Sequence, residues 1–156
     1  MSYVDDNLVA GENVMYRAHL HWVLYITAVL AALLVIAVGL ALAADKSTKD
    51  IAWFFFVLAP LPLIRPYLLC RFSEFAVTDK RVLVKTGILN RHTLETLLTK
   101  VENISVDQSL GGRMLNYGTI TVTGTGGTKE QFARIAAPLE FRKQIQAATL
   151  KYQEQR

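Results

Sequence analysis

Residues Trp22 to Ala44 read WVLYITAVLAALLVIAVGLALAA, a stretch without a single charged side chain in a chain of 156 residues. A helix over these residues would rise about 34 Å at 1.5 Å per residue. That length is enough to cross the hydrocarbon core of a bilayer. His21, Trp22 and Tyr25 stand at its start, where amphipathic rings settle among lipid headgroups. The stretch therefore predicts a transmembrane helix.

A second apolar stretch, IAWFFFVLAPLPLI, occupies residues 51–64 after the polar link Asp45–Asp50. This stretch alone is short for a span, since about 20 residues are needed. It reaches that length when it is counted to Cys70, provided that Arg65 extends its charge to the interface. We therefore predict a membrane hairpin over residues 20–70, with spans at about 22–44 and 51–70.

Two prolines, Pro60 and Pro62, are expected to kink or break the second helix, because each removes a backbone hydrogen-bond donor. The link at residues 45–50 is too short for anything but an antiparallel turn, so the two helices should pack as a hairpin. A buried hairpin of a soluble protein is the alternative. It is disfavoured because both helices are apolar on every face.

A secretory signal is another interpretation of the first stretch, since Ala41-Leu42-Ala43 matches an A-x-A cleavage site. Signals begin with positive residues, whereas this N-terminal region holds Asp5, Asp6 and Glu12 and one cation, Arg17. The apolar stretch is also longer than the usual core of roughly 7–15 residues. A retained transmembrane helix is the favoured interpretation.

Positive charges beside the predicted spans indicate the orientation in the membrane. Arg17 precedes the first span, and the second is followed by Arg65, Arg71, Lys80, Arg81 and Lys85. The connecting link has only Lys46 and Lys49, each beside an aspartate. We expect a multi-pass protein of the inner (plasma) membrane with both termini in the cytoplasm.

The positive charge of the chain is concentrated in its C-terminal half. Residues 71–156 carry 13 Lys and Arg against 8 Asp and Glu, whereas residues 1–70 carry 4 against 5. An anionic membrane surface attracts such a domain when the domain is tethered nearby. No run of basic residues exceeds two, so a nucleic-acid partner is not expected. The single cysteine, Cys70, excludes an internal disulfide.

After Arg71 the sequence changes to short runs of alternating polar and apolar residues. The clearest alternation lies at Thr119–Thr123, where Ile120 and Val122 share one face. Gly124–Gly127 is expected to form a hairpin turn, and Met114 a short helical turn. We predict six strands, at residues 74–78, 81–85, 88–98 (bent at Thr93), 103–107, 119–123 and 130–135.

Pro138 fits the first position of a helix, and Phe141, Ile145, Ala148 and Tyr152 follow at helical spacing. This single apolar stripe predicts an amphipathic helix that closes the mouth or edge of a small sheet or barrel. The predicted fold class is α+β, with a two-helix transmembrane hairpin and a small β-barrel or sandwich capped by a C-terminal helix.

Residues Asn13–Arg17 also have strand character, with Val14 and Tyr16 on one face. We hypothesise that they pair with the C-terminal sheet as a seventh strand. The membrane hairpin would then be an insertion into the domain, which is possible because both of its ends lie on the same side of the membrane.

Three stretches resemble a known family: FAVTDKRVLVKTGILNR (75–91), KVENISVDQS (100–109) and RMLNYGTITVTGTGG (113–127). They look like the bacterial pleckstrin-homology-like (PH-like) domain of the second type, which commonly follows two transmembrane helices. The upstream LVAGENVMYRAHLHW (8–22) is similar to the leader of such proteins. The resemblance implies a partly open β-barrel capped by a C-terminal helix. We expect a cytoplasmic segment at 1–19, the hairpin at 20–70 and the PH-like domain at 71–156.

The sequence predicts no catalytic residue, no metal site and no cofactor. His19, His21 and His92 have no cysteine or carboxylate at a usual metal-ligand spacing. Gly124–Gly127 leads into an expected strand, whereas a phosphate-binding loop opens onto a helix. The carboxylates, among them Asp79, Glu95, Glu102 and Asp107, are expected to be solvated surface groups. We therefore predict that the protein is not an enzyme.

The favoured function is a membrane-anchored scaffold that binds another membrane protein or a second copy of itself, through an edge strand or the groove beside the capping helix. Small residues suit the first helix to close packing between subunits, namely Ala31, Ala32, Ala37, Gly39 and Ala41. The alternative is a sensor of anionic lipid or of the membrane surface. Its candidate lipid- or ligand-binding residues are Arg65, Arg71, Lys80, Arg81 and Lys85. A subunit of an oligomeric channel or transport assembly is disfavoured, because Thr27 is the only polar side chain between Ile26 and Ala44.

Overall fold

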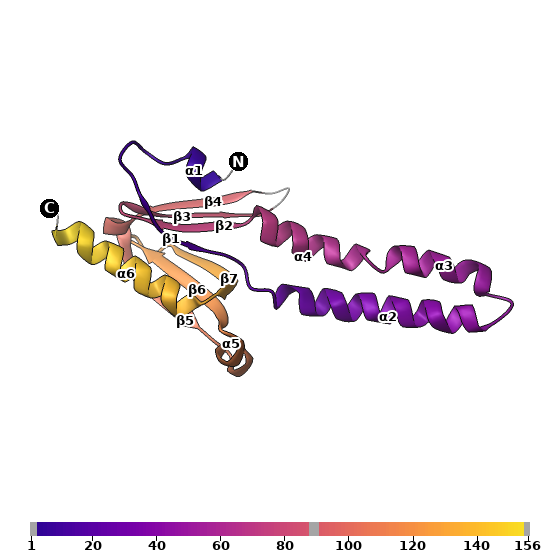
Figure 1. The fold of residues 1–156 in the computed structure, drawn as a ribbon. Coiled ribbons are helices and arrows are strands. Elements are labelled where there is room, and N and C mark those ends of the chain that lie inside the picture. Colours follow the sequence, from indigo (N-terminus) through magenta and orange to yellow (C-terminus); the bar gives the residue numbers. More distant parts are fainter. Residues whose placement is uncertain (1–2, 88–90, 155–156) are drawn as a thin grey trace. The chain divides into compact units, whose positions relative to one another are not determined.

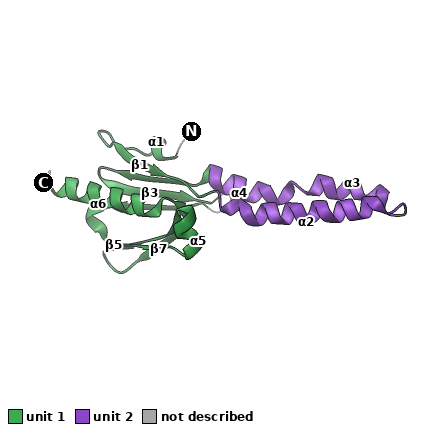
Figure 2. Ribbon diagram, turned by 60° about the horizontal axis from the view of Figure 1, so that its bottom comes forward, with its two compact units in different colours: residues 1–21, 72–156 green, residues 22–71 purple. Residues whose placement is uncertain are grey.

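The computed structural model describes residues 3–87 and 91–154 and divides the chain into two compact units. The strand domain combines residues 1–21 with residues 72–156, and the helical insertion is residues 22–71 (Figure 2). The insertion therefore interrupts the strand domain in the sequence. The N-terminal segment belongs to that domain instead of forming a region of its own.

The helical insertion is an antiparallel hairpin. Helix α2 (Leu24–Ala44) packs against α3 (Lys49–Leu58), and α4 (Leu61–Phe72) continues toward the strand domain in the sequence. The break between α3 and α4 falls at Ala59 and Pro60, because Pro60 has no N–H to donate into the helix. The predicted interruption of the second helix is thus present, whereas Pro62 is accommodated inside the first turn of α4.

Small residues on α2 allow the two helical arms of the hairpin to pack closely together. Ala28, Ala32 and Gly39 are its buried residues, and a Cβ atom added at Gly39 would lie 3.1 Å from the Cβ of Phe55. Of the small residues expected to serve contacts between subunits, Ala32 and Gly39 are therefore used inside the hairpin. The exposed ones are Ala31, Ala37 and Ala41.

The strand domain contains a four-stranded antiparallel sheet in the order β1-β2-β3-β4 (Figure 1). Its strands are β1 (Val14–Ala18), β2 (Glu74–Thr78), β3 (Arg81–Thr86) and β4 (His92–Leu97). The predicted strands at 74–78 and 81–85 are present. The third strand was predicted at residues 88–98. Strand β4 covers His92–Leu97 of this range, and residues 88–90 lie outside the described part of the chain.

The strand expected at Asn13–Arg17 is present as β1. It pairs with β2, although the whole insertion separates the two strands in sequence. Ala18 lies opposite Phe75 in this register. The chain therefore leaves the sheet and returns to it on two neighbouring strands.

A short helix, α1 (Tyr3–Asp6), covers the outer face of this sheet. Its Val4 packs against Ala76 and Leu83, which point away from the main core. For this reason β2 and β3 are buried on both faces over much of their length.

The second sheet has three antiparallel strands in the order β5-β6-β7: β5 (Val101–Asp107), β6 (Tyr117–Gly124) and β7 (Lys129–Ala136). A 3-10 turn at Leu98–Lys100 leads from β4 into β5, and the short helix α5 (Leu110–Leu115) connects β5 to β6. The two sheets also meet where Leu20 forms a bridge with Ile135. The predicted hairpin turn at Gly124–Gly127 joins β6 to β7, with Gly126 and Gly127 at positive φ.

The C-terminal helix α6 (Pro138–Glu154) begins at the predicted proline. Phe141, Ile145 and Ala148 are buried between it and both sheets, and Tyr152 packs at the margin of this core. Each large side chain buried there contributes about 1.5–3 kcal/mol by removal from water. The core is completed by Phe75, Val77, Val82, Val84, Leu98, Ile120, Val122, Phe132 and Ile135. The predicted fold class, a helical hairpin with a small PH-like strand domain capped by a helix, agrees with this structure.

Candidate functional site

The β2–β3 turn carries two of the five cations predicted to bind lipid or ligand, Lys80 and Arg81, and Thr78 shapes it. The fully buried Thr78 hydroxyl accepts the backbone N–H groups of Lys80 and Arg81, at 3.2 and 2.9 Å. A threonine that bonds backbone two and three residues ahead is a usual way to stabilise a tight turn. The turn thereby holds Lys80 and Arg81 in fixed positions at the start of β3.

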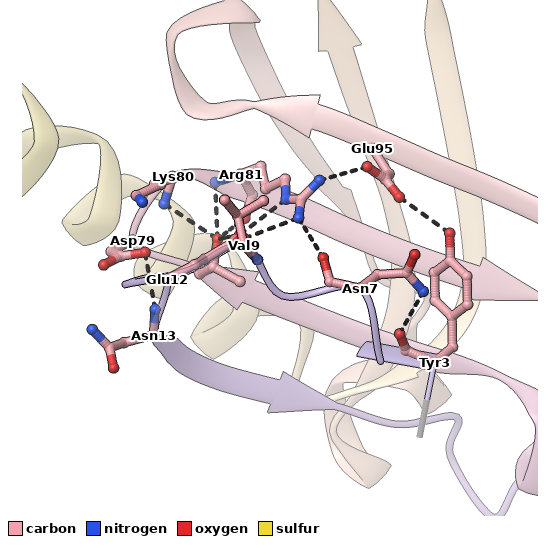
Figure 3. A network of polar contacts seen from close by, with 10 residues as sticks. Tyr3, Asn7, Val9, Glu12, Asn13, Asp79, Lys80, Arg81 and Glu95 are labelled. Carbon is pink, nitrogen blue, oxygen red and sulfur yellow. Dashed lines mark hydrogen bonds and ion pairs between the residues drawn. The ribbon is translucent and has the colours of Figure 1, made fainter. Parts of the chain in front are cut away.

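Arg81 is bound on all sides by acceptors from the strand domain itself (Figure 3). Its Nε and Nη2 donate to the two carboxylate oxygens of Glu12, both at 2.9 Å. Its Nη1 donates to Glu95 at 2.7 Å, and Nη2 also donates to the carbonyl oxygen of Asn7 at 2.7 Å. Only 15% of the Arg81 side chain is exposed. Arg81 therefore ties the N-terminal segment to β3 and β4.

Glu12 is the buried centre of this network, with a side chain that is 0% exposed. Besides Arg81, it accepts the hydroxyl of Thr78 at 2.7 Å and the backbone N–H of Val9 at 2.9 Å. Burial is the largest single influence on its pKa and raises it, but the combined hydrogen bonds and the charge of Arg81 outweigh burial and lower the pKa to about 2. Glu12 is thus a fully paired, ionised buried group.

A second ion pair anchors the start of α1. Glu74 accepts the backbone N–H groups of Tyr3 and Val4, at 3.0 and 3.2 Å, which satisfies donors left free at a helix N-terminus. Lys85 lies 3.7 Å from Glu74, and its ammonium lies 5.1 Å from the centre of the Tyr3 ring. Only 14% of the Lys85 side chain is exposed. Lys85 therefore holds the N-terminal segment in place.

Within the strand domain, Lys80, Arg81 and Lys85 are consequently not a free cationic cluster. Arg81 and Lys85 are engaged with buried or partly buried carboxylates, and Lys80 is half-buried beside them. Arg65 and Arg71 are exposed on α4 in the other unit. The carboxylate partners of Arg81 and Lys85 were not predicted. Glu12 is 69 residues from Arg81 along the chain, whereas Glu74 faces Lys85 across the β2–β3 hairpin. Glu95, expected as a solvated surface group, is bound to Arg81.

A groove between β5 and α6 is the better candidate for binding. It has a volume of about 400 Å³ and is bordered on the strand side by Val101, Glu102, Asn103 and Ile104, and on the helix side by Gln146, Thr149, Leu150 and Gln153. Strand β5 is the outer strand of its sheet, pairing with β6 on one edge. Among the residues that the structure describes, no strand pairs with its other edge.

The chemistry of the groove suits an extended polypeptide. An unpaired strand edge offers backbone donors and acceptors in a regular row. Leu150 is 61% exposed above this edge and offers an apolar contact, while the glutamines and Thr149 offer hydrogen bonds. Over the described residues, no group of three His, Cys, Asp or Glu side chains could hold a metal ion. The groove therefore combines a strand edge with apolar and hydrogen-bonding side chains.

Comparison with known proteins places this geometry in context. The sequence model of one family, described as bacterial PH domain, matches residues 16–149, a range that runs through both units. A solved structure of a DUF1696 family protein with a pleckstrin-homology domain, from Shewanella loihica PV-4, is 12% identical with a TM-score of 0.39. That match covers 49% of this chain and 70% of the other. No curated protein matches this chain.

Proposed function

The chain belongs to the bacterial PH domain family, and from this premise we propose that it is a membrane-anchored, non-enzymatic interaction module. Its helical insertion is the anchor. Its binding surface is the groove between β5 and α6, which takes an extended segment of a membrane-protein partner or of a second copy of the chain. The observation that carries the proposal is the unpaired edge of β5 beside the exposed Leu150.

The apolar surface of the insertion supports its role as the anchor. The 18-residue apolar windows of α2 and of the segment Lys49–Phe72 have mean hydropathies of 2.8 and 1.6, and both segments are long enough to span a bilayer. Only 17% of each is buried, whereas the core helix of a soluble protein is mostly buried. Large side chains are exposed on several sides of α2, among them Leu30, Leu33, Leu34 and Leu40. Such a surface is stable in lipid and unfavourable in water.

The pairing of β1 with β2 also argues against a cleaved secretory signal. Cleavage after Ala43 would remove β1 together with Glu12, the ion-pair partner of Arg81. The sheet would lose an edge strand, and a buried arginine would lose its principal acceptor. A retained anchor preserves both.

Strand addition explains how the groove would bind. An extended segment that pairs with β5 gains backbone hydrogen bonds along the edge, and alternate side chains of that segment reach the groove floor and Leu150. The alternative proposal, a lipid sensor that uses the β2–β3 cations, has less support because Arg81 and Lys85 are already neutralised by Glu12, Glu95 and Glu74.

A photo-crosslinking amino acid at Leu150 of the full chain, expressed in its native membrane, tests the proposal. The matched control is the same amino acid at Ala147, which is exposed on α6 but does not line the groove. We expect strong crosslinks from position 150 and weak ones from position 147. A product of twice the chain mass of 17.4 kDa identifies a second copy, and mass spectrometry identifies any other partner.

The substitution Leu150→Arg provides the second half of this test. It should abolish crosslinks from a probe at Gln153, whereas Ala147→Arg, which adds the same charge outside the groove, should leave them intact. Equal crosslinking from positions 147 and 150, or crosslinks that survive Leu150→Arg, would contradict the proposal.

A further inference from the structure

Of the described residues, the two most exposed large apolar side chains of the strand domain lie on α5. Leu110 is 79% exposed and Met114 is 86% exposed, and Leu115 at the end of the helix is 41% exposed. Leu110 and Met114 are one helical turn apart, so they lie on the same face of α5. Figure 1 shows α5 projecting beyond the ends of β5 and β6. Two such side chains exposed together on a projection are unfavourable in water.

Helix α5 is built as a rigid projection. Ser109 caps its start by accepting the N–H of Gly112 at 3.1 Å, and Asn116 ends it in the left-handed conformation, at a φ of 58°. Gly112 is buried on the opposite face from Leu110 and Met114, and a Cβ atom there would lie 2.6 Å from the carbonyl oxygen of Tyr117. The glycine thus seats α5 directly on β6. The apolar face is held outward by the fold.

The base of α5 contacts the point where the strand domain ends and the insertion begins. The ring of His21 stacks on the ring of Tyr117 with centroids 5.2 Å apart, and the N–H of His21 donates to the carbonyl oxygen of Arg134 at 2.8 Å. His21 is buried in these contacts. The residue after it, Trp22, begins the insertion, and its Cα lies about 3.8 Å from that of His21 across one peptide bond.

This covalent proximity decides what covers the apolar face. With Trp22 in the headgroup region, as expected, the peptide bond to His21 would keep the residues that pack on His21 near the lipid surface. Arg113 on α5 is exposed, and so is Arg134, which lines a hollow together with Asp107, Ser109 and Tyr117. Both arginines complement anionic headgroups. An apolar tip flanked by arginines is the composition of segments that settle in a membrane interface.

We propose that α5 is a membrane-inserting wedge, in which Leu110 and Met114 enter the acyl boundary of the bilayer while Arg113 and Arg134 bind anionic headgroups. The inference rests on the proposed function, since it requires the insertion to lie in the membrane. It adds a second contact with the bilayer, made by the strand domain itself. That contact restricts how the β5–α6 groove can turn toward a partner.

Depth measurement on the full chain in liposomes tests the wedge. An environment-sensitive fluorophore is attached at Met114→Cys in a Cys70→Ala background, and the control label is at Thr125→Cys, at the far end of β6 from α5. Vesicles of zwitterionic and anionic phospholipid are prepared with and without brominated acyl chains, which quench only fluorophores that reach them. Quenching of Trp22 and Trp53 in the same samples reports whether the insertion is in the bilayer.

The expected result is quenched tryptophans, a blue-shifted and quenched label at 114, and an aqueous, unquenched label at 125. Adding Leu110→Asp should return the label at 114 to an aqueous spectrum. Quenched tryptophans with an unquenched label at 114, whether or not its emission is shifted, would overturn the wedge and leave the anchor standing. Unquenched tryptophans would overturn the proposed anchor and the wedge with it.

Discussion

Arg81 connects three parts of the strand domain that are distant in sequence: the loop before β1, β3 itself and β4. Its guanidinium is 15% exposed and faces the wholly buried carboxylate of Glu12. The contribution of such a pair to stability is measured by removing one member, because the other is then left charged without a partner in a place that water does not reach.

We therefore predict that Arg81→Met lowers the free energy of unfolding of the strand domain by about 3 kcal/mol. A urea titration of the full chain in detergent micelles, followed by near-ultraviolet circular dichroism, measures this change. Lys80→Met is the matched control, with an expected change within about 0.5 kcal/mol because Lys80 is a half-buried neighbour outside the ion-pair network. Equal destabilisation by both substitutions would show that Arg81 acts only through packing.

Acid should weaken the same network. The pKa of Glu12 is about 2 in the folded protein, below its ordinary value of 4.5. A carboxylate whose folded-state pKa is depressed contributes stability above its unfolded pKa and loses it as the pH falls through the folded value. The stability that Glu12 contributes should therefore decline between about pH 5 and pH 2. The measurement compares unfolding free energies at several pH values in this window for the natural chain and for Glu12→Gln, whose decline should be shallower. Parallel curves would contradict this assignment.

At the residue scale, the sequence indicates which side chains are candidates for a site better than it indicates which groups they contact. Arg81 and Lys85 are predicted to bind lipid or ligand from their charge and their closeness in sequence to the membrane segment. Arg81 binds Glu12, which the loop after α1 brings to it across about 70 residues of sequence. Lys85 binds Glu74 on the neighbouring strand β2 and lies over the ring of Tyr3 in α1. No local pattern encodes the contact between Arg81 and Glu12, and lipid binding by Arg81 and Lys85 stays a prediction.

The elements themselves follow local signals closely. Alternation of polar and apolar residues indicates β2, β3, β6 and β7, and the proline and apolar stripe indicate α6. Helix α1 was not predicted, because four residues carry too weak a periodicity to be read from sequence. The separation into two sheets was also not predicted, since it depends on how the strands meet and not on any one of them.

Strand β1 is the element on which the continuity of the strand domain depends. Deletion of residues 1–18 removes β1, α1 and Glu12, so the amides of β2 should lose protection from hydrogen exchange in the full-length remainder. The amides of α2 in the same sample are the internal control and should keep their protection. Unchanged protection of Phe75 to Val77 would show that β1 is dispensable for the sheet.

The whole molecule is a strand domain with a helical insertion between two paired strands, and the proposed anchor places the tip of that insertion across the membrane. We predict that a cysteine at Ser47, in a Cys70→Ala background, reacts with a membrane-impermeant maleimide on intact spheroplasts. A cysteine at Lys143, exposed on α6, should react only after permeabilisation. Labelling of position 143 from outside would invert the orientation, and labelling of both would exclude a spanning hairpin.

The pairing of β1 with β2 has a consequence for biogenesis. The ribosome delivers β1 before the hydrophobic hairpin and β2 after it, so the sheet cannot be completed until the hairpin has left the translation machinery. With the hairpin inserted as proposed, the two strands meet only if the bilayer has been crossed an even number of times. In a chain that stalls after one crossing, β1 and β2 would lie in different compartments, and Glu12 would be separated from Arg81. With that topology, closure of the sheet would require correct insertion, and misinserted chains would be left unfolded and open to proteolysis.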